Sequence, residues 1–173
     1  PDLSAPALVG LFEREKVTFS AGVPTVWGGI KQYLMEHPEA DTSSIRAFLC
    51  GGSAVPRAMI SWFQQERGIP IQQGWGMTET NPVASVSTLL PEHAELPFEE
   101  QLDRLETAGV PVAGLQVKIV DESGAELPHD GVAFGELLIR GPWIAAEYYR
   151  DERREAFVDG WMRTGDVCKI TSE

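Results

Sequence analysis

The first hundred residues alternate between helix-like and strand-like patterns, and this alternation limits the fold more than any other feature. A helix that begins at Pro24 has an apolar face formed by Val26, Trp27, Ile30 and Leu34. The same reasoning predicts helices over 6–16 and 56–67 and strands over 17–20, 45–50 and 69–72. Because strands and helices follow one another in β-α-β order, we predict an α/β fold with a parallel sheet and covering helices.

The pattern changes after Gly109, where short β-type segments replace the helices. Strands are predicted over 116–121, 135–140 and 166–170, with a turn at 122–124. The predicted fold class is therefore an α/β subdomain over residues 1–108, followed by a smaller β-rich, barrel-like subdomain over residues 109–173.

An acidic segment lies between these two parts. Residues 92–106 contain six acidic side chains and one arginine, yet Phe98, Leu102 and Leu105 recur at the spacing of one helix face. We expect a surface helix whose acidic face is solvated.

The formal charge of −12 argues against a nucleic-acid partner, because binding to phosphates needs clustered Lys and Arg side chains. No apolar run is long enough to span a bilayer, and the first residues lack a signal-peptide pattern, so we expect a soluble cytoplasmic protein. Cys50 and Cys168 lie among apolar residues and are expected to be buried thiols. The three histidines show no metal-ligand spacing.

The segment Gly74-Trp75-Gly76-Met77-Thr78-Glu79-Thr80 follows a predicted strand, and open α/β sheets bind their ligands at the carboxyl ends of strands. Its glycines allow backbone to approach a flat ligand, and Trp75 offers a stacking surface. Thr78 can donate to a phosphate, and Glu79 is a hard oxygen ligand suited to Mg²⁺. Taken alone, the spacing fits a glycine-rich turn with a helix-capping threonine equally well.

Two further segments have the same character. Gly51-Gly52-Ser53-Ala54-Val55-Pro56 places a glycine pair between a predicted strand and a helix, and two such loops could hold one planar ring. Trp161-Met162-Arg163-Thr164-Gly165-Asp166 ends in a carboxylate at the start of a predicted strand, which could accept hydrogen bonds from ribose hydroxyls or cap a turn. Each segment alone also fits an ordinary turn.

Together these segments resemble the adenylate-forming superfamily in their order and rough spacing, as does Gly135-Glu136-Leu137-Leu138-Ile139-Arg140-Gly141-Pro142. Within it the chain looks most like medium- and long-chain fatty acyl-CoA synthetases, through residues 21–27 and 141–144. The resemblance covers essentially the entire chain. It implies part of the N-terminal domain of an enzyme that uses ATP, Mg²⁺ and CoA to convert a fatty acid to acyl-AMP and then to acyl-CoA.

The resemblance also implies roles for single residues. Thr78 matches the threonine that contacts phosphate, Glu79 the magnesium carboxylate, and Asp166 the residue that holds the ribose hydroxyls. The implied cofactor-binding positions are Gly51, Gly52, Ser53, Gln73, Gly74, Trp75, Gly76, Met77, Thr78 and Asp166. Arg163 is interpreted as structural, while Val23, Trp27 and the Pro82-Val83 pair are interpreted as walls of a fatty-acid tunnel.

The chain departs from the family pattern because the phosphate loop expected upstream and the lysine-bearing domain expected downstream are absent from it. With Pro1 at its start and an end just after a strand pattern, we expect a piece of a longer polypeptide that is inactive when isolated. An aryl-CoA ligase, an amino-acid adenylation domain and a non-catalytic structural module remain alternatives, and the sequence leaves a homodimer open.

Overall fold

The computed structural model describes residues 2–150 and 154–172. The chain forms two compact units, one from Pro1–Gly76 with Ser85–Val110 and the other from Met77–Ala84 with Pro111–Glu173. The boundary at residues 108 and 109 stays a prediction, and the structure groups residues 77–84 with the second unit.

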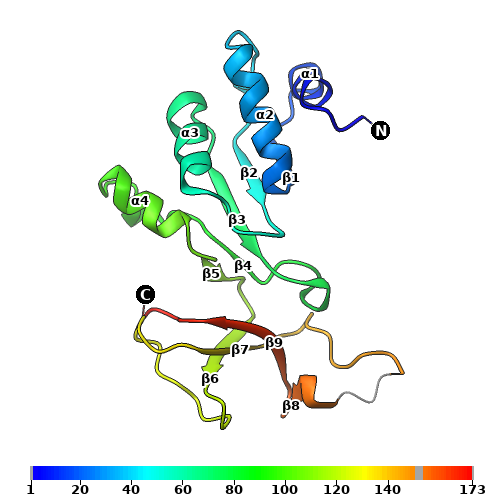
Figure 1. Cartoon of the computed structure of the whole chain (residues 1–173), viewed down its shortest axis with the longest axis vertical. Helices are drawn as coiled ribbons and strands as arrows, with labels where there is room; N and C mark the ends of the chain where they lie inside the picture. Colours follow the sequence, from blue (N-terminus) through cyan, green and yellow to red (C-terminus); the bar gives the residue numbers. More distant parts are fainter. Residues whose placement is uncertain (1, 151–153, 173) are drawn as a thin grey trace. The chain divides into compact units, whose positions relative to one another are not determined.

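The first unit alternates helices and strands along the chain (Figure 1). Its α-helices are α1 (Ala5–Glu15), α2 (Pro24–Glu36), α3 (Arg57–Arg67) and α4 (Phe98–Leu105), and η2 (Pro91–His93) is a short 3-10 turn. Its strands are β1 (Phe19–Gly22), β2 (Ala47–Cys50), β3 (Ile71–Trp75) and β4 (Ser85–Val86). Strand β5 (Val110–Pro111) starts at Val110, the last residue of this unit.

The sheet has the strand order β1-β2-β3-β4-β5. Strands β1, β2 and β3 are parallel neighbours, in which Gly22 pairs with Cys50 and Cys50 with Gln73, whereas β4 runs antiparallel to β3. The predicted parallel β-α-β arrangement is therefore confirmed, and β4 and β5 extend the sheet beyond β3.

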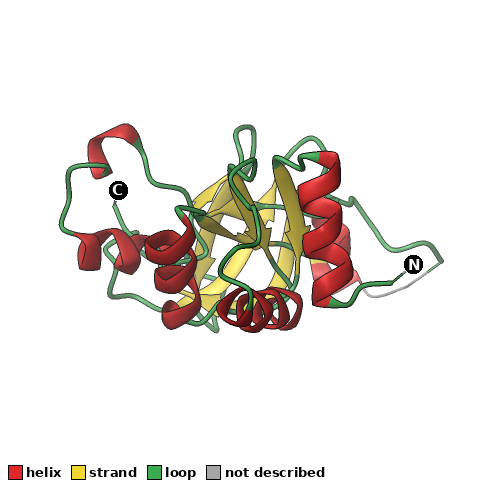
Figure 2. Ribbon diagram, turned by 90° about the horizontal axis from the view of Figure 1, so that it is seen from above, coloured by secondary structure: helices red, strands yellow, loops and turns green. Residues whose placement is uncertain are grey.

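The helices pack on one face of this sheet. Along β2, Phe48 and Cys50 are fully buried, whereas Leu49 between them is only half-buried. Both β-α-β connections are expected to be right-handed, which places α2 and α3 on the same face. Figure 2 shows the helices in red and the strands in yellow.

Phe48 stands at the centre of the core. Its ring stacks on Trp27 at a centroid distance of 4.2 Å, and it also contacts Phe12 at 5.9 Å and Phe63 at 5.5 Å. The apolar face predicted for the second helix is confirmed, because Trp27, Ile30 and Leu34 are all buried. One ring on β2 thus joins α1, α2 and α3 to the sheet.

The chain after α4 returns closely to β4. Gly109 has φ of +80°, and a Cβ atom there would lie 2.0 Å from the carbonyl oxygen of Val86. Ser85 Oγ also donates to the carbonyl of Ala108 at 2.7 Å. Only glycine allows this approach, which holds the end of α4 near the carboxyl end of β3.

The second unit is an antiparallel sheet with the order β6-β7-β9-β8. Its strands are β6 (Gln116–Val120), β7 (Gly135–Arg140), β8 (Phe157–Val158) and β9 (Trp161–Cys168), accompanied by the 3-10 turns η1 (Thr78–Thr80) and η3 (Arg154–Ala156). Ile119, Ile139 and Met162 are buried on successive strands. A register shift between Glu136 and Leu138 bends the pairing of β7 with β9, and the predicted β-rich, barrel-like character is confirmed.

Two strand boundaries differ from the sequence prediction for the same physical reason. Strand β3 continues to Trp75 rather than ending at Gln72, because β4 pairs with Gly74 and Trp75. Strand β9 begins at Trp161 rather than Asp166, because its first half pairs with both β7 and β8. Among the described residues, no helix combines the length and apolarity needed to cross a bilayer.

Replacing Phe48 with Ala should lower the free energy of unfolding by about 3–5 kcal/mol, because it leaves a cavity between three helices and the sheet. The matched control is Phe19→Ala, since Phe19 is 49% exposed and its truncation should cost no more than about 1 kcal/mol. Urea unfolding followed by tryptophan fluorescence measures both. Equal losses in the two variants would contradict the central place of Phe48.

Candidate active site

Two glycine-bearing segments meet at the carboxyl ends of β2 and β3. Cys50 pairs with Gln73, so the loop after β2 begins beside the end of β3. A Cβ atom on Gly51 would lie 3.1 Å from the carbonyl oxygen of Gly74, and the Gly51 amide donates to the Gly22 carbonyl at 3.1 Å. The structure therefore brings together the first two segments that the sequence singled out.

The loop after β2 presents a small exposed surface. Gly52 and Ser53 are exposed, and Gly52 has φ of +84°, a conformation that favours glycine. Because Gly52 lacks a side chain, the backbone there is open to a close-fitting ligand.

Gln73 joins this loop to the segment that follows α4. Its Oε1 accepts the amide of Val55 at 2.7 Å, and its Nε2 donates to the carbonyls of Glu106 at 3.2 Å and Thr107 at 3.0 Å. The Gln73 backbone amide donates to Ser87 Oγ, and its carbonyl accepts the Ser87 amide. Gln73 is 8% exposed, so its side chain shapes the site by holding the backbone around it.

The two threonines of the turn over Thr78–Thr80 differ in burial and in hydrogen bonding. Thr80 is fully buried, and its Oγ1 accepts the Met77 amide at 2.9 Å and lies 2.6 Å from the carbonyl of Pro82, to which it can donate. Thr78 is exposed. The capping task that the sequence left open is therefore filled by Thr80, and the hydroxyl of Thr78 lies on the surface.

Glu79 is oriented by a residue that the sequence interpretation missed. The Tyr148 hydroxyl donates to Glu79 Oε1 at 2.6 Å, and the Ala145 amide donates to the Glu79 carbonyl at 2.9 Å. The Tyr148 ring packs edge-on against Phe157 at 5.3 Å. The hydrogen bond from Tyr148 lowers the pKa of Glu79, so the carboxylate is ionised and held in one orientation.

The donor set around Glu79 suits only one kind of metal site. The described part of the chain contains no group of three or more His, Cys, Asp or Glu side chains that could enclose an ion. Mg²⁺ is commonly held by one or two carboxylates together with water and substrate phosphates, and a carboxylate with one oxygen bound to Tyr148 can still offer the other. The residues present therefore fit a substrate-bridged Mg²⁺.

Asp166 lies inside β9 and is exposed, so its predicted place at the start of a strand is wrong. Gly165 before it has φ of +76°, and the Asp166 amide donates to Thr164 Oγ1 at 3.1 Å. Thr164 Oγ1 in turn donates to the Leu137 carbonyl at 2.9 Å. This local irregularity of the strand determines how the carboxylate is presented.

The predicted site residues fall into both units. Gly51, Gly52, Ser53, Gln73, Gly74, Trp75 and Gly76 belong to the first unit, and Met77, Thr78, Glu79 and Asp166 belong to the second. Convergence of both groups on one nucleotide stays a prediction.

The family described as AMP-binding enzyme matches residues 1–149. The chain belongs to this AMP-binding enzyme family. Its fold also matches solved structures, among them the amide bond synthetase McbA from Marinactinospora thermotolerans, with a TM-score of 0.82 and 27% identity over 97% of this chain and 32% of that one. The N-terminal domain of FACL13 from Mycobacterium tuberculosis gives a TM-score of 0.81 and 27% identity, covering 97% of this chain and 39% of that domain chain.

Curated relatives of this AMP-binding chain include CoA ligases. It is 38% identical to a 3-methylmercaptopropionyl-CoA ligase of Ruegeria lacuscaerulensis, over 98% of this chain and 31% of the relative. It is 42% identical to a long-chain-fatty-acid–CoA ligase of Thermus thermophilus, over 97% of this chain and 31% of the relative. The chain spans about a third of the length of these relatives, and the predicted resemblance to adenylate-forming CoA ligases is confirmed.

In this member of the AMP-binding enzyme family, Trp27 and Cys168 differ in their surroundings from the sequence interpretation. Trp27 is 1% exposed and stacks on Phe48, so it is a core residue, whereas Val23 is 45% exposed. Trp27 therefore gives no information on the acyl group. Cys50 is buried, and burial raises its pKa to about 11, whereas Cys168 is only half-buried, which corrects the prediction of two buried thiols.

The structural interpretation of Arg163 is supported by its ion pair with Glu136, which joins β9 to β7 in the AMP-binding chain. The hydrogen bond from Arg163 is the largest cause that lowers the pKa of Glu136. A lowered carboxyl pKa contributes stability above the unfolded pKa, and this contribution is lost as the pH falls through the lower folded value. The pair is partly exposed, so its contribution should be no more than about 1 kcal/mol.

Glu136→Gln should therefore reduce the stability at pH 7 and flatten the loss of stability below about pH 4. Thermal unfolding measured from pH 7 to pH 3 tests this expectation. Glu126→Gln serves as the control, because Glu126 is 63% exposed and lies 3.7 Å from Lys118. A pH profile for Glu136→Gln that is parallel to that of the unchanged protein would contradict the role of the pair.

Proposed function

We propose that this chain is part of an ATP-dependent fatty acid–CoA ligase that forms acyl-AMP and then acyl-CoA. The observation that carries the proposal is the close approach of Gly51, which begins the loop after β2, to Gly74, near the carboxyl end of the parallel strand β3. Open α/β sheets bind ligands at this edge, and glycines, which lack a side chain, let the backbone approach a planar base. Membership of the AMP-binding enzyme family supports the same conclusion.

We assign the adenine and acyl-adenylate surface to the loop after β2 and to the end of β3 with the residues that follow it. Trp75 supplies an aromatic face, while Gln73 holds the backbone of the loop after β2 through Val55. The residues proposed to line this surface are Gly51, Gly52, Ser53, Gln73, Gly74, Trp75, Gly76 and Met77. Asp166 is proposed to accept hydrogen bonds from the ribose hydroxyls.

The proposed chemistry proceeds in two displacements. The fatty-acid carboxylate attacks the α-phosphorus of ATP and pyrophosphate leaves, and the CoA thiol then attacks the acyl carbon and AMP leaves. Thr78 donates its exposed hydroxyl to a phosphate oxygen, and Glu79, ionised and oriented by Tyr148, holds Mg²⁺. Mg²⁺, when bound, would supply charge neutralisation at the phosphates.

The net charge of the chain bears on whether the isolated chain can be catalytically active. Its formal charge of −12 leaves few cations for ATP and CoA, which are both polyanions. We propose that the remaining cations come from other parts of a longer protein and that the isolated chain does not turn over. A cytoplasmic location and a homodimer stay predictions.

The names of the relatives point to several classes of acyl substrate. Relatives are named for long-chain and medium-chain fatty acids, for 3-methylmercaptopropionate and, at 32% identity, for feruloyl-CoA. The methylmercaptopropionyl relatives favour a short thioether acid as the second candidate.

The full-length protein should catalyse pyrophosphate exchange into ATP with aliphatic acids, and CoA should then accept the acyl group. A panel of saturated acids, 3-methylmercaptopropionate, ferulate and amino acids identifies the substrate class. Exchange with aryl or amino acids alone would replace the fatty-acid proposal with the corresponding branch of the family. If a stable acyl-adenylate analogue gives no saturable heat in calorimetry, the chain serves as a non-catalytic module.

Glu79→Gln should lower the adenylation rate and weaken the dependence on Mg²⁺, because the amide lacks the charge that holds the ion. Tyr148→Phe keeps the ring against Phe157 but removes the hydroxyl, so the apparent Mg²⁺ affinity should fall about tenfold. Tyr149→Phe is the matched control, since Tyr149 is 84% exposed. An unchanged Mg²⁺ titration for Glu79→Gln would remove Glu79 from the metal role.

A further inference from the structure

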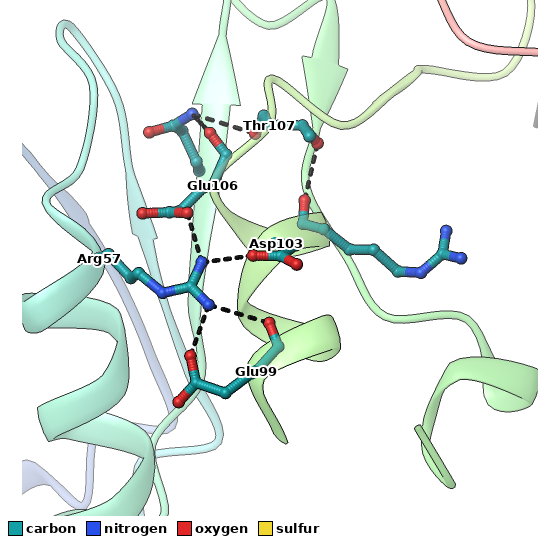
Figure 3. A network of polar contacts seen from close by, with 7 residues as sticks. Arg57, Glu99, Asp103, Glu106 and Thr107 are labelled. Carbon is teal, nitrogen blue, oxygen red and sulfur yellow. Dashed lines mark hydrogen bonds and ion pairs between the residues drawn. The ribbon is translucent and has the colours of Figure 1, made fainter. Parts of the chain in front are cut away.

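Arg57, in the first turn of α3, binds three carboxylates, two on α4 and one on Glu106, the residue that follows this helix (Figure 3). Its Nη1 donates to Asp103 Oδ1 at 2.7 Å and to Glu106 Oε2 at 2.6 Å. Its Nη2 donates to Glu99 Oε2 at 2.7 Å and to the Glu99 carbonyl at 3.0 Å. The acidic face of this helix is therefore not merely solvated, because one guanidinium gathers the three acids at positions i, i+4 and i+7.

The segment at the carboxyl end of α4, where Glu106 lies, also contacts Gln73. The carbonyls of Glu106 and Thr107 accept both hydrogens of the Gln73 amide, and Gln73 Oε1 accepts the amide of Val55. Val55 is 5% exposed and lies two residues before Arg57. The contacts therefore close a ring that runs from Arg57 to Glu106, to Gln73, to Val55 and back along the chain to Arg57.

This ring fixes one end of the loop after β2. Gly51 at the other end is held by the Gly22 carbonyl and lies against Gly74. Three exposed residues, Gly52, Ser53 and Ala54, lie between these two anchors, and Gly52 and Ser53 belong to the proposed adenylate surface. Any movement of the end of α4 would shift Gln73, and with it the Val55 end of the loop.

We propose that Arg57 is a positioning residue for the adenylate site, which it serves by holding the end of α4 against Gln73 and thereby fixing the loop over residues 51–55. This inference rests on the proposed function for its consequence in nucleotide binding. The ring itself is defined by contacts within the first unit.

A role in local order differs measurably from a role in overall stability. The carboxylates of Glu99 and Asp103 are 76% and 68% exposed, and exposed ion pairs add little to the free energy of unfolding. Loss of Arg57 should therefore leave the cooperative unfolding transition nearly unchanged. The effect should appear in the amide of Val55, whose hydrogen bond to Gln73 is the last link of the ring.

The test compares full-length proteins by amide hydrogen exchange and by nucleotide kinetics. In Arg57→Ala the Val55 amide should exchange about fivefold faster or more, and the KM for ATP should rise while kcat changes less. Arg57→Lys should be intermediate, because an ammonium group cannot match the fork of a guanidinium. Raising the salt concentration should speed Val55 exchange in the unchanged protein and have little further effect in Arg57→Ala.

Two acidic variants provide a matched pair within the ring. Glu106→Gln weakens the link that lies next to Gln73, so it should raise Val55 exchange and the KM for ATP. Glu99→Gln removes the same charge from the other end of α4, where no contact to Gln73 is made, and should stay close to the unchanged protein. Arg46→Ala, at an exposed arginine of the first unit, controls for loss of positive charge.

Val55 exchange tests the ring itself, and the KM for ATP tests its effect on nucleotide binding. Unchanged Val55 exchange in Arg57→Ala overturns the ring, and faster exchange with an unchanged KM for ATP overturns the positioning role. If the unchanged protein binds neither ATP nor an acyl-adenylate analogue, the proposed function and the positioning role both fail, while Val55 exchange still decides whether Arg57 orders the loop.

Discussion

The parallel pairing of β2 with β3 is the constraint on which the candidate site depends. It places Cys50 beside Gln73, so the two glycine-bearing segments that follow must leave the sheet at the same edge. The burial of Phe48 among three helices fixes β2 in this sheet. A packed core on one face of the sheet thus gives the two glycine-bearing segments a defined separation.

Polar contacts then refine what the sheet positions. Gln73 uses its whole side chain to connect the loop after β2 with the end of α4, and Tyr148 orients Glu79 in the second unit. Both contacts act on the backbone or on a carboxylate that we assign to ligand binding. Preorganisation of this kind reduces the ordering that a nucleotide would otherwise have to impose.

The sequence predicted the parts of the structure that local patterns control. The apolar face of α2 and the strand over Gly135–Arg140 were predicted correctly, because helical and strand periods are visible in short windows. The ends of β3 and the start of β9 were missed, since they depend on partner strands far along the chain. Tyr148 and Arg57 were missed for a related reason: their partners lie 69 and up to 49 residues away, and no local pattern encodes such contacts.

The most direct measurement is the pattern of amide protection when the full-length protein binds a non-hydrolysable acyl-adenylate analogue. If one nucleotide contacts both glycine-bearing segments and the carboxylate on β9, then residues 51–53, 74–79 and 165–166 gain protection together, with the same dependence on ligand concentration. Protection confined to one of these segments, or saturable binding that protects none of them, would contradict a shared adenylate site.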